Sequence, residues 1–286
     1  MTVERGPSPG NQIDDAVVKR YFDGAEGTSA AAMSVMSHEH NLPARAVGYR
    51  LGRELRTIGP WLDAVDRSGR VLDVGCGAGA WVEVFANRYG SAVGVERSQL
   101  MVEAAKERVA YLSNAEVHQG DGRQDLPDGP FDLIFLGGLM MYQGDADVVS
   151  LLRSLRSRLS EGGAIILRES TVRRGVLALK GEYQVVYRSV DVYQRLFEEA
   201  GTAAVEVRRN FGYTCLVIAE ELVDLRRRCL PFMPKDSPSL GSLTWSLLRA
   251  ATPISFWALP QALSILNVPW PKLQNHFFRL KPTGGG

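Results

Sequence analysis

Cysteine is scarce in this sequence, and its three copies, Cys76, Cys215 and Cys229, have no short spacing between them. An odd number of widely spaced cysteines argues against a disulfide framework and against a zinc site built from thiolates. Residues 1–11 also lack the apolar run of a signal peptide. We therefore expect reduced thiols, no bound metal and a cytoplasmic location.

The sequence also lacks an excess of charge of either sign. Lys and Arg total 33 and Asp and Glu total 32, which gives a formal net charge of +1. Proteins that bind nucleic acid cluster basic residues against the phosphates. The one dense basic run, Arg226–Arg228, is typical of the solvated end of a helix. We therefore expect no nucleic-acid partner.

Apolar runs of strand length alternate with amphipathic segments in the middle of the chain, after two segments with helical spacing at 13–22 and 43–65. The pattern predicts strands at 71–74, 92–95, 115–119, 131–136 and 164–167, and helices at 81–89, 99–111, 146–159 and 189–200. Such alternation is typical of a parallel sheet covered on both faces. Two further runs, 203–207 and 213–219, are joined by a link too short for a parallel crossover, which predicts an antiparallel hairpin.

These elements predict three regions: an N-terminal lead-in and helical cap over 1–66, a core over 67–221 and an apolar C-terminal helical extension over 222–286. The core is expected to be α/β, a doubly wound and mostly parallel seven-stranded sheet with one antiparallel strand. In the extension, Arg249 is the only charged residue between Asp236 and Lys272, and prolines interrupt the apolar run. Because such prolines disfavour a membrane-spanning helix, we expect short helices packed on the core or on a second copy in a homo-oligomer. Membrane association through the extension is the less favoured alternative.

A glycine-rich turn follows the first strand over Asp73–Gly79, which reads DVGCGAG. Glycines let a ligand approach the backbone closely, and the helix behind them presents free N–H groups. Alone, such a turn is also typical of a dinucleotide site or of a tight turn. The next two strands end at Glu96 and Asp121, where carboxylates can bind ribose hydroxyls and an adenine amino group. These strand ends meet at one edge of the sheet, where α/β proteins bind ligands.

In order and spacing, these motifs resemble those of the class I S-adenosylmethionine-dependent methyltransferases over about residues 65–220. The turn at 159–163 also matches the one before the fifth strand of that family. The resemblance implies a Rossmann-like fold and S-adenosylmethionine as the cofactor. In the family, the glycines approach the methionine end, the second acid holds the ribose and the third holds adenine. The implied cofactor-binding residues are Asp73, Gly75, Cys76, Gly77, Gly79, Glu96, Arg97, Asp121, Gly122, Leu136 and Gly137.

The acceptor side carries a weaker signal. The fourth strand is not followed by the Asn-Pro-Pro-aromatic turn of nucleobase amino-methyltransferases. Residues 181–189 resemble the segment that lines the acceptor pocket in small-molecule and protein α-N-terminal amine methyltransferases, but Lys180 and Tyr183 replace the paired acids expected for a peptide amine. The resemblance suggests catalytic roles for Glu169, Tyr187 and Arg188, and substrate binding by Tyr142, Tyr183 and Arg188. The alternative is that 187–189 form a helix cap with a packing aromatic.

The expected function is methyl transfer to oxygen or nitrogen of a small-molecule acceptor, for example in the biosynthesis of a hydrophobic natural product. A sulfonium methyl donor is already activated, so the protein mainly positions donor and acceptor. A base is needed only if the acceptor must lose a proton. Alternatives are a cyclase on the same fold, a methyltransferase that acts on a peptide amine or a lipid, and a nicotinamide dehydrogenase.

Overall fold

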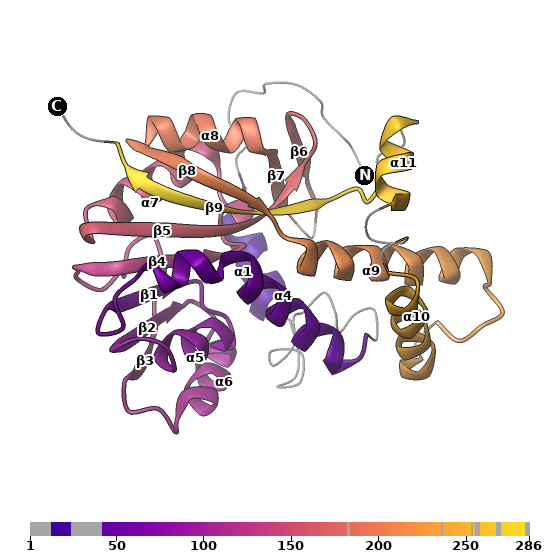
Figure 1. Ribbon diagram of the computed structural model, residues 1–286, viewed down its shortest axis with the longest axis horizontal. Coiled ribbons are helices and arrows are strands. Elements are labelled where there is room, and N and C mark those ends of the chain that lie inside the picture. Colours follow the sequence, from indigo (N-terminus) through magenta and orange to yellow (C-terminus); the bar gives the residue numbers. More distant parts are fainter. Residues whose placement is uncertain are drawn as a thin grey trace.

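The computed structural model describes residues 13–23, 42–181, 184–235, 237–252, 254, 258–266 and 270–283. Tyr183, predicted to bind substrate, lies outside these ranges. Figure 1 shows the elements in chain order, which are α1 (Asp15–Asp23), α4 (Ala44–Asp63), β1 (Arg70–Val74), α5 (Ala80–Ala86), β2 (Ser91–Glu96), α6 (Gln99–Val109), β3 (Ala115–Gln119), β4 (Phe131–Gly137), η1 (Met140–Tyr142), α7 (Asp145–Arg156), β5 (Leu159–Val172), β6 (Val176–Leu179), β7 (Val185–Ser189), α8 (Val190–Glu199), β8 (Thr202–Arg209), α9 (Phe211–Cys229), α10 (Pro238–Ala250), α11 (Leu259–Ile265) and β9 (Gln274–Pro282).

The sheet confirms the predicted doubly wound, mostly parallel architecture. Strands β3, β2, β1, β4 and β5 lie side by side in that order, all parallel. On the other side of β5, β9 pairs antiparallel with both β5 and β8. Seven of the nine strands in the described sheet therefore form a Rossmann-like core in which β9 is the antiparallel member. A further hairpin, β6–β7, pairs with the last residues of β5.

The predicted antiparallel strand at 213–219 is wrong. These residues lie in α9, whose first turn is capped by the side chain of Asn210, which accepts a hydrogen bond from the backbone N–H of Tyr213. The apolar run is buried on most sides of the helix, and a short run of this kind has the same appearance in a buried strand and in a buried helix. The antiparallel strand is instead β9, so residues 274–282 of the predicted extension lie within the sheet.

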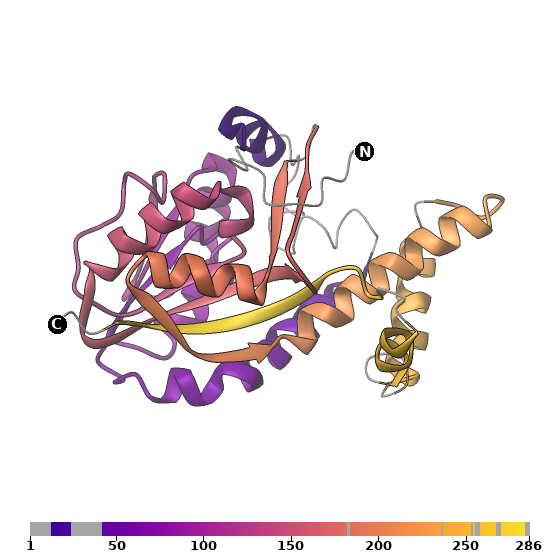
Figure 2. The ribbon, with the colours of Figure 1, turned by 90° about the horizontal axis from the view of Figure 1, so that it is seen from above.

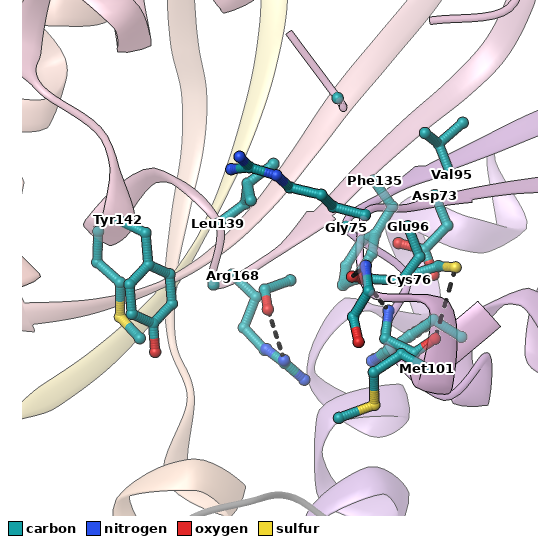
Figure 3. Close-up of a pocket in the computed structure, with 18 of the residues that line it drawn as sticks. Asp73, Gly75, Cys76, Val95, Glu96, Met101, Phe135, Leu139, Tyr142 and Arg168 are labelled. Carbon is teal, nitrogen blue, oxygen red and sulfur yellow. Dashed lines mark hydrogen bonds between the residues drawn. The ribbon is translucent and has the colours of Figure 1, made fainter. Parts of the chain in front are cut away.

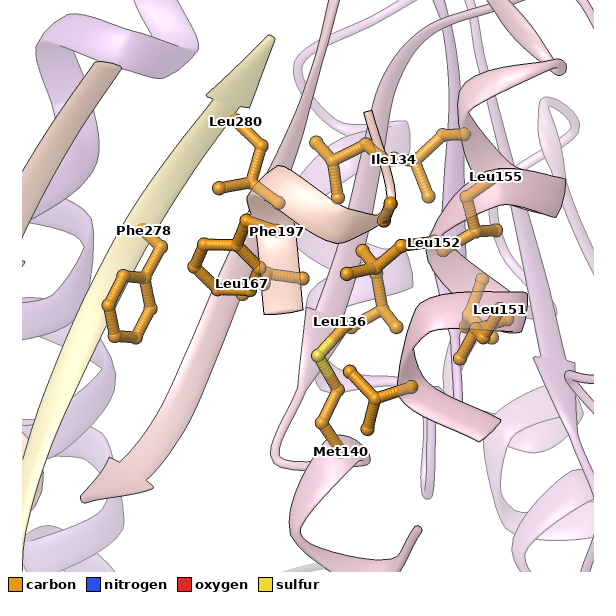
Figure 4. Packing of buried hydrophobic residues seen from close by; sticks show 14 of the residues in the cluster. Ile134, Leu136, Met140, Leu151, Leu152, Leu155, Leu167, Phe197, Phe278 and Leu280 are labelled. Carbon is orange, nitrogen blue, oxygen red and sulfur yellow. The ribbon is translucent and has the colours of Figure 1, made fainter. Parts of the chain in front are cut away.

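Two apolar cores lie on opposite faces of the sheet. One fills the space between the sheet and helices α7 and α8, with Leu152, Phe197 and Phe278 fully buried (Figure 4). The other lies against α4, α5 and α6 and includes Ile58 and Phe85. Burying one such side chain contributes about 1.5–3 kcal/mol. The two cores fix the strands from both sides, so the loops at the strand ends stand on a rigid framework.

Helices α9, α10 and α11 extend beyond the end of the sheet (Figure 2). Trp245 and Leu248 of α10 pack with Ile218 of α9 and with Leu42 and Ala46, which lie at the start of α4. The part of the extension that forms α10 therefore packs against α9 and the start of the N-terminal cap. Among the described helices, none has the length and apolar character needed to cross a membrane.

Candidate active site

A cavity of about 340 Å³ opens at the carboxyl ends of the parallel strands. Its walls include the β1–α5 turn and the ends of β2, β3, β4 and β5, together with parts of α1, α4 and α9 (Figure 3). Most of the predicted cofactor-binding residues line it, namely Asp73, Gly75, Cys76, Gly77, Glu96, Arg97, Asp121, Gly122 and Gly137. The strand order therefore brings together motifs that are separated in the sequence.

Two predicted cofactor-binding residues do not line the cavity. Gly79 has a φ of +77°, and a Cβ placed there would lie 2.9 Å from the Cβ of Ala105 in α6. This glycine thus permits the left-handed turn and the close approach of α5 and α6. Leu136 is fully buried in the core against α7. The position of each residue indicates a role in packing.

Glu96 accepts a hydrogen bond from the glycine turn at the edge of the cavity. Gly77 has a φ of +53°, and a Cβ placed there would have no heavy atom within 4 Å. Its backbone N–H donates to Oε2 of Glu96 at 2.9 Å, and the N–H of Ser98 donates to Oε1 at 2.9 Å. A carboxylate has about four acceptor positions. Glu96 therefore keeps capacity for two further donors such as the hydroxyls of a ribose.

Charged residues at the β2–β3 end of the cavity hold α1 across it. Asp15 in α1 accepts from both Nη atoms of Arg97 at 2.9 Å and from Nη2 of Arg123 at 2.9 Å. Arg123 also donates to both oxygens of Asp121, at 3.0 and 2.7 Å. These hydrogen bonds lower the pKa of Asp121, with Arg123 as the main cause. Asp121 lines the cavity as predicted, but its carboxylate is paired with an arginine.

Asp73 lies beside the glycine turn and is 2% exposed. Burial raises its pKa to about 8, and the charge of Glu96 acts in the same direction while Arg168 opposes it. The carboxyl group is therefore mostly protonated at neutral pH before a ligand binds. A positively charged ligand beside it would favour the ionised form.

Two arginines that were not predicted as site residues line the β5 end of the cavity. Arg168 in β5 donates to the carbonyl of Gly137 at 2.9 Å and to Oε2 of Glu54 at 3.2 Å. Arg50, one turn before Glu54 in α4, has its Nε 3.7 Å from Oε1 of the same glutamate. The sequence signals were the i,i+4 spacing of Arg50 and Glu54 and the place of Arg168 at the end of a strand. Tyr213 of α9 lies on the same wall.

The three predicted catalytic residues are not brought to the cavity. Side chains alternate along a strand, so Arg168 and Ser170 face the cavity while Glu169 faces the opposite side of β5. Glu169 is fully buried and accepts from the backbone N–H of Met140 at 3.1 Å and from the hydroxyl of Tyr193 at 3.4 Å. Burial raises its pKa to about 7.

Arg188 and Tyr187 do not line the cavity either. Arg188, with no exposed surface, donates to the carbonyls of Met140 at 3.0 Å and Gln143 at 2.7 Å and pairs with Asp145. Tyr187 packs against Met141. Glu169 and Arg188 together hold both ends of η1, whose residues Met141 and Tyr142 line the cavity. Of the two predicted substrate-binding residues that the structure describes, Tyr142 lines the cavity and Arg188 does not.

Comparison with known proteins finds similarity to methyltransferases. Residues 71–163 match a family model described as a methyltransferase domain. Demethylmenaquinone methyltransferase of Staphylococcus aureus is 28% identical over 181 residues, which cover 52% of this chain and 73% of that protein.

Solved structures share the fold at lower identity. A SAM-dependent methyltransferase of Leishmania major has a TM-score of 0.58 and 19% identity, over 93% of this chain and 82% of its own. An O-methyltransferase from a multienzyme of Brevibacillus brevis, crystallised with S-adenosylhomocysteine, has a TM-score of 0.55 and 19% identity, over 84% of this chain and 73% of its own. Residues 71–163 thus match a methyltransferase domain, and the sheet topology and the motifs at its edge are consistent with a class I S-adenosylmethionine-dependent methyltransferase.

Proposed function

We propose that the protein transfers the methyl group of S-adenosylmethionine to an oxygen or nitrogen atom of a small organic acceptor. The observation that carries this proposal is a single cavity that both the cofactor motifs and a second set of residues line. The cofactor motifs follow β1, β2 and β3, and the second set comes from α4, η1, β5 and α9. One cavity with these two walls can hold a donor and an acceptor in contact.

The cofactor fits the residues at the β1–β3 end. In this proposal Glu96 binds the ribose hydroxyls, because it lines the cavity and each of its oxygens accepts only one backbone N–H in the described residues. Gly75 and Gly77 let the methionine end lie against the backbone. Asp73 faces the positive charge of that end, and α1 covers the adenosine end through Asp15.

Bound S-adenosylmethionine supplies an activated methyl group, and the protein's own residues supply position. Tyr142 and Ser170 lie at the acceptor end of the cavity. Glu169 and Arg188 act through η1, because their hydrogen bonds fix the backbone of Met140 beside Tyr142. We therefore propose that they are positioning residues. Correct placement of reactants accounts for a large part of the barrier in such displacements.

Relatives support a small acceptor. The curated relative is described as acting on demethylmenaquinone, and the structural neighbour from Brevibacillus brevis as an O-methyltransferase. The first name gives an organic molecule as the acceptor, and the second gives oxygen as the methylated atom. We propose that the acceptor of this chain is an organic molecule with a nucleophilic oxygen or nitrogen.

The proposal is tested by incubating the full-length protein with S-adenosylmethionine and a panel of phenols, carboxylic acids and amines. We expect acceptor-dependent formation of S-adenosylhomocysteine and a product heavier by one methyl group, both measured by mass spectrometry. Glu96→Gln should lower the rate at subsaturating cofactor, whereas Glu107→Gln, an exposed glutamate of α6, should not. Conversion of a substrate without demethylation of the cofactor would favour the cyclase, and binding of NAD alone would reject the proposal.

A further inference from the structure

Two arginines meet at the end of the cavity formed by β5 and β9. Arg50 comes from α4 and Arg168 from β5, and both line the cavity with side chains that are 13% and 12% exposed. Ser170, Tyr213 and Asn275 line the same end, from β5, α9 and β9. Ser170 and Asn275 face each other in the register of β5 and β9. Figure 3 shows Arg168 on the side of the cavity toward Tyr142, apart from the group around Glu96 and Met101.

Two guanidinium groups at this end share the carboxylate of Glu54, while Glu220 acts on the charge of Arg50 and Asp73 on that of Arg168. Glu54 is within ion-pair distance of both arginines, and its carboxylate is shared with the amide of Asn210. The Nε atoms of Arg50 and Arg168 are buried and have no hydrogen-bond partner among the described residues. Burial lowers the pKa of Arg50, with the charge of Glu54 opposing it and that of Arg168 acting in the same direction. Burial also acts to lower the pKa of Arg168, but Glu54 together with other nearby groups outweighs burial, so this pKa is raised. Leaving such groups buried without partners is costly, which favours a bound anion.

The position of the pair separates it from Glu96, the proposed ribose contact. The strand order is β2, β1, β4, β5, and neighbouring strands lie about 4.8 Å apart. Three such spacings place the end of β5 about 14 Å from the end of β2, which carries Glu96. Among the described lining residues, the carboxylates other than Asp73 lie on α1 or at the ends of β2 and β3. The β5 end thus presents two guanidinium groups together with neutral hydrogen-bonding groups.

We propose that the methyl acceptor is an organic acid whose carboxylate binds between Arg50 and Arg168. This inference rests on the proposed function, since it names the class of acceptor that enters the same cavity. A guanidinium group and a carboxylate are planar and form short, charge-assisted hydrogen bonds. Ser170, Tyr213 and Asn275 then contact the neighbouring part of the acceptor. The carboxylate selects the acceptor and fixes its orientation toward the cofactor.

The test uses a matched pair of probes with nearly the same shape, the anion 2-naphthoate and the neutral 2-naphthamide, with 2-naphthyl phosphate as a third arm. Each is titrated by calorimetry into full-length protein saturated with S-adenosylhomocysteine. Because hydrogen bonds to charged groups contribute about 1.5–3 kcal/mol, the wild type should bind the acid at least about tenfold more tightly than the amide. In Arg50→Met, which keeps the side-chain stem, this preference should be lost. Arg56→Met, an exposed arginine on the same helix, should retain it.

The outcomes separate this inference from the proposed function. Equal affinity of the wild type for acid and amide would refute the carboxylate subsite, and this comparison needs no variant. A preference for the phosphate ester over the acid would reject the carboxylate in favour of a phosphate. Weaker binding of S-adenosylhomocysteine to Arg50→Met with an unchanged acid preference would assign Arg50 to the cofactor and overturn the inference. Failure of the wild type to bind S-adenosylhomocysteine would instead reject the proposed function.

Discussion

Replacing Glu169 by glutamine tests the buried network behind the cavity through its effect on stability. Glu169 is fully buried, and burial raises its pKa from 4.5 to about 7. Between these pH values the folded protein holds a proton on Glu169 that the unfolded chain releases. The free energy of unfolding therefore falls as pH rises through this range. A shift of this size corresponds to about 3 kcal/mol once the pH is above about 8.

Glutamine has the shape of the protonated glutamate and does not ionise. Its amide oxygen can accept the N–H of Met140 as Glu169 does now, so we expect Glu169→Gln to fold normally. The variant should match the wild type near pH 5 and exceed its stability by up to about 3 kcal/mol above about pH 8. Urea unfolding followed by the fluorescence of the buried tryptophans Trp61, Trp81 and Trp245 measures both proteins.

The difference between the two proteins isolates Glu169, because all other titrating groups are common to both. A stability difference that does not change between about pH 5 and pH 8 would contradict the assigned burial of the carboxyl group. Glu169→Ala is the contrasting variant. It leaves the N–H of Met140 without its partner and, relative to Glu169→Gln, should cost about 1–3 kcal/mol at every pH, in addition to the loss of packing.

Three further predictions concern the cavity. Asp73, with a pKa of about 8, should ionise when the cationic cofactor binds, so binding near pH 7 should release a proton. Calorimetry in two buffers measures this release, and an equal release from Asp73→Asn would exclude Asp73 as the source of the proton. Glu96→Gln should raise the cofactor dissociation constant at least about tenfold, and unchanged affinity would mean that another group holds the ribose. Asp15→Asn should speed cofactor release in stopped-flow measurements by roughly two- to fivefold. The effect is small because the ion pairs of Asp15 with Arg97 and Arg123 are partly exposed. An unchanged rate would show that α1 does not restrain release.

The sequence by itself determines the local elements and the cofactor motifs. Mostly apolar strands at 71–74 and 131–136 match β1 and β4 because strands covered on both faces bury most of their side chains. The glycines after Asp73 indicate a turn because positive φ angles favour glycine, and Gly75, Gly77 and Gly79 adopt them. An acid at the end of β2 is visible without a structure, since it needs only the strand boundary. These features depend on residues close together in the chain.

Tertiary structure decides what depends on distant residues. The antiparallel strand comes from residues 274–282 because Ile165 pairs with Leu280, a contact that no local pattern encodes. The run at 213–219 becomes a helix because α4 and α10 cover it on several sides. Periodicity alone does not distinguish these outcomes.

The acceptor end of the cavity is decided in the same way. Arg168 faces the cavity and Glu169 faces the opposite core because the pairing of β5 with β4 and β9 sets which face each residue occupies. Arg50 and Tyr213 reach the same wall because α4 and α9 pack together, although they are far apart in the chain. The sequence therefore determines where the cofactor motifs lie, and the packing of distant elements determines which side chains the acceptor meets.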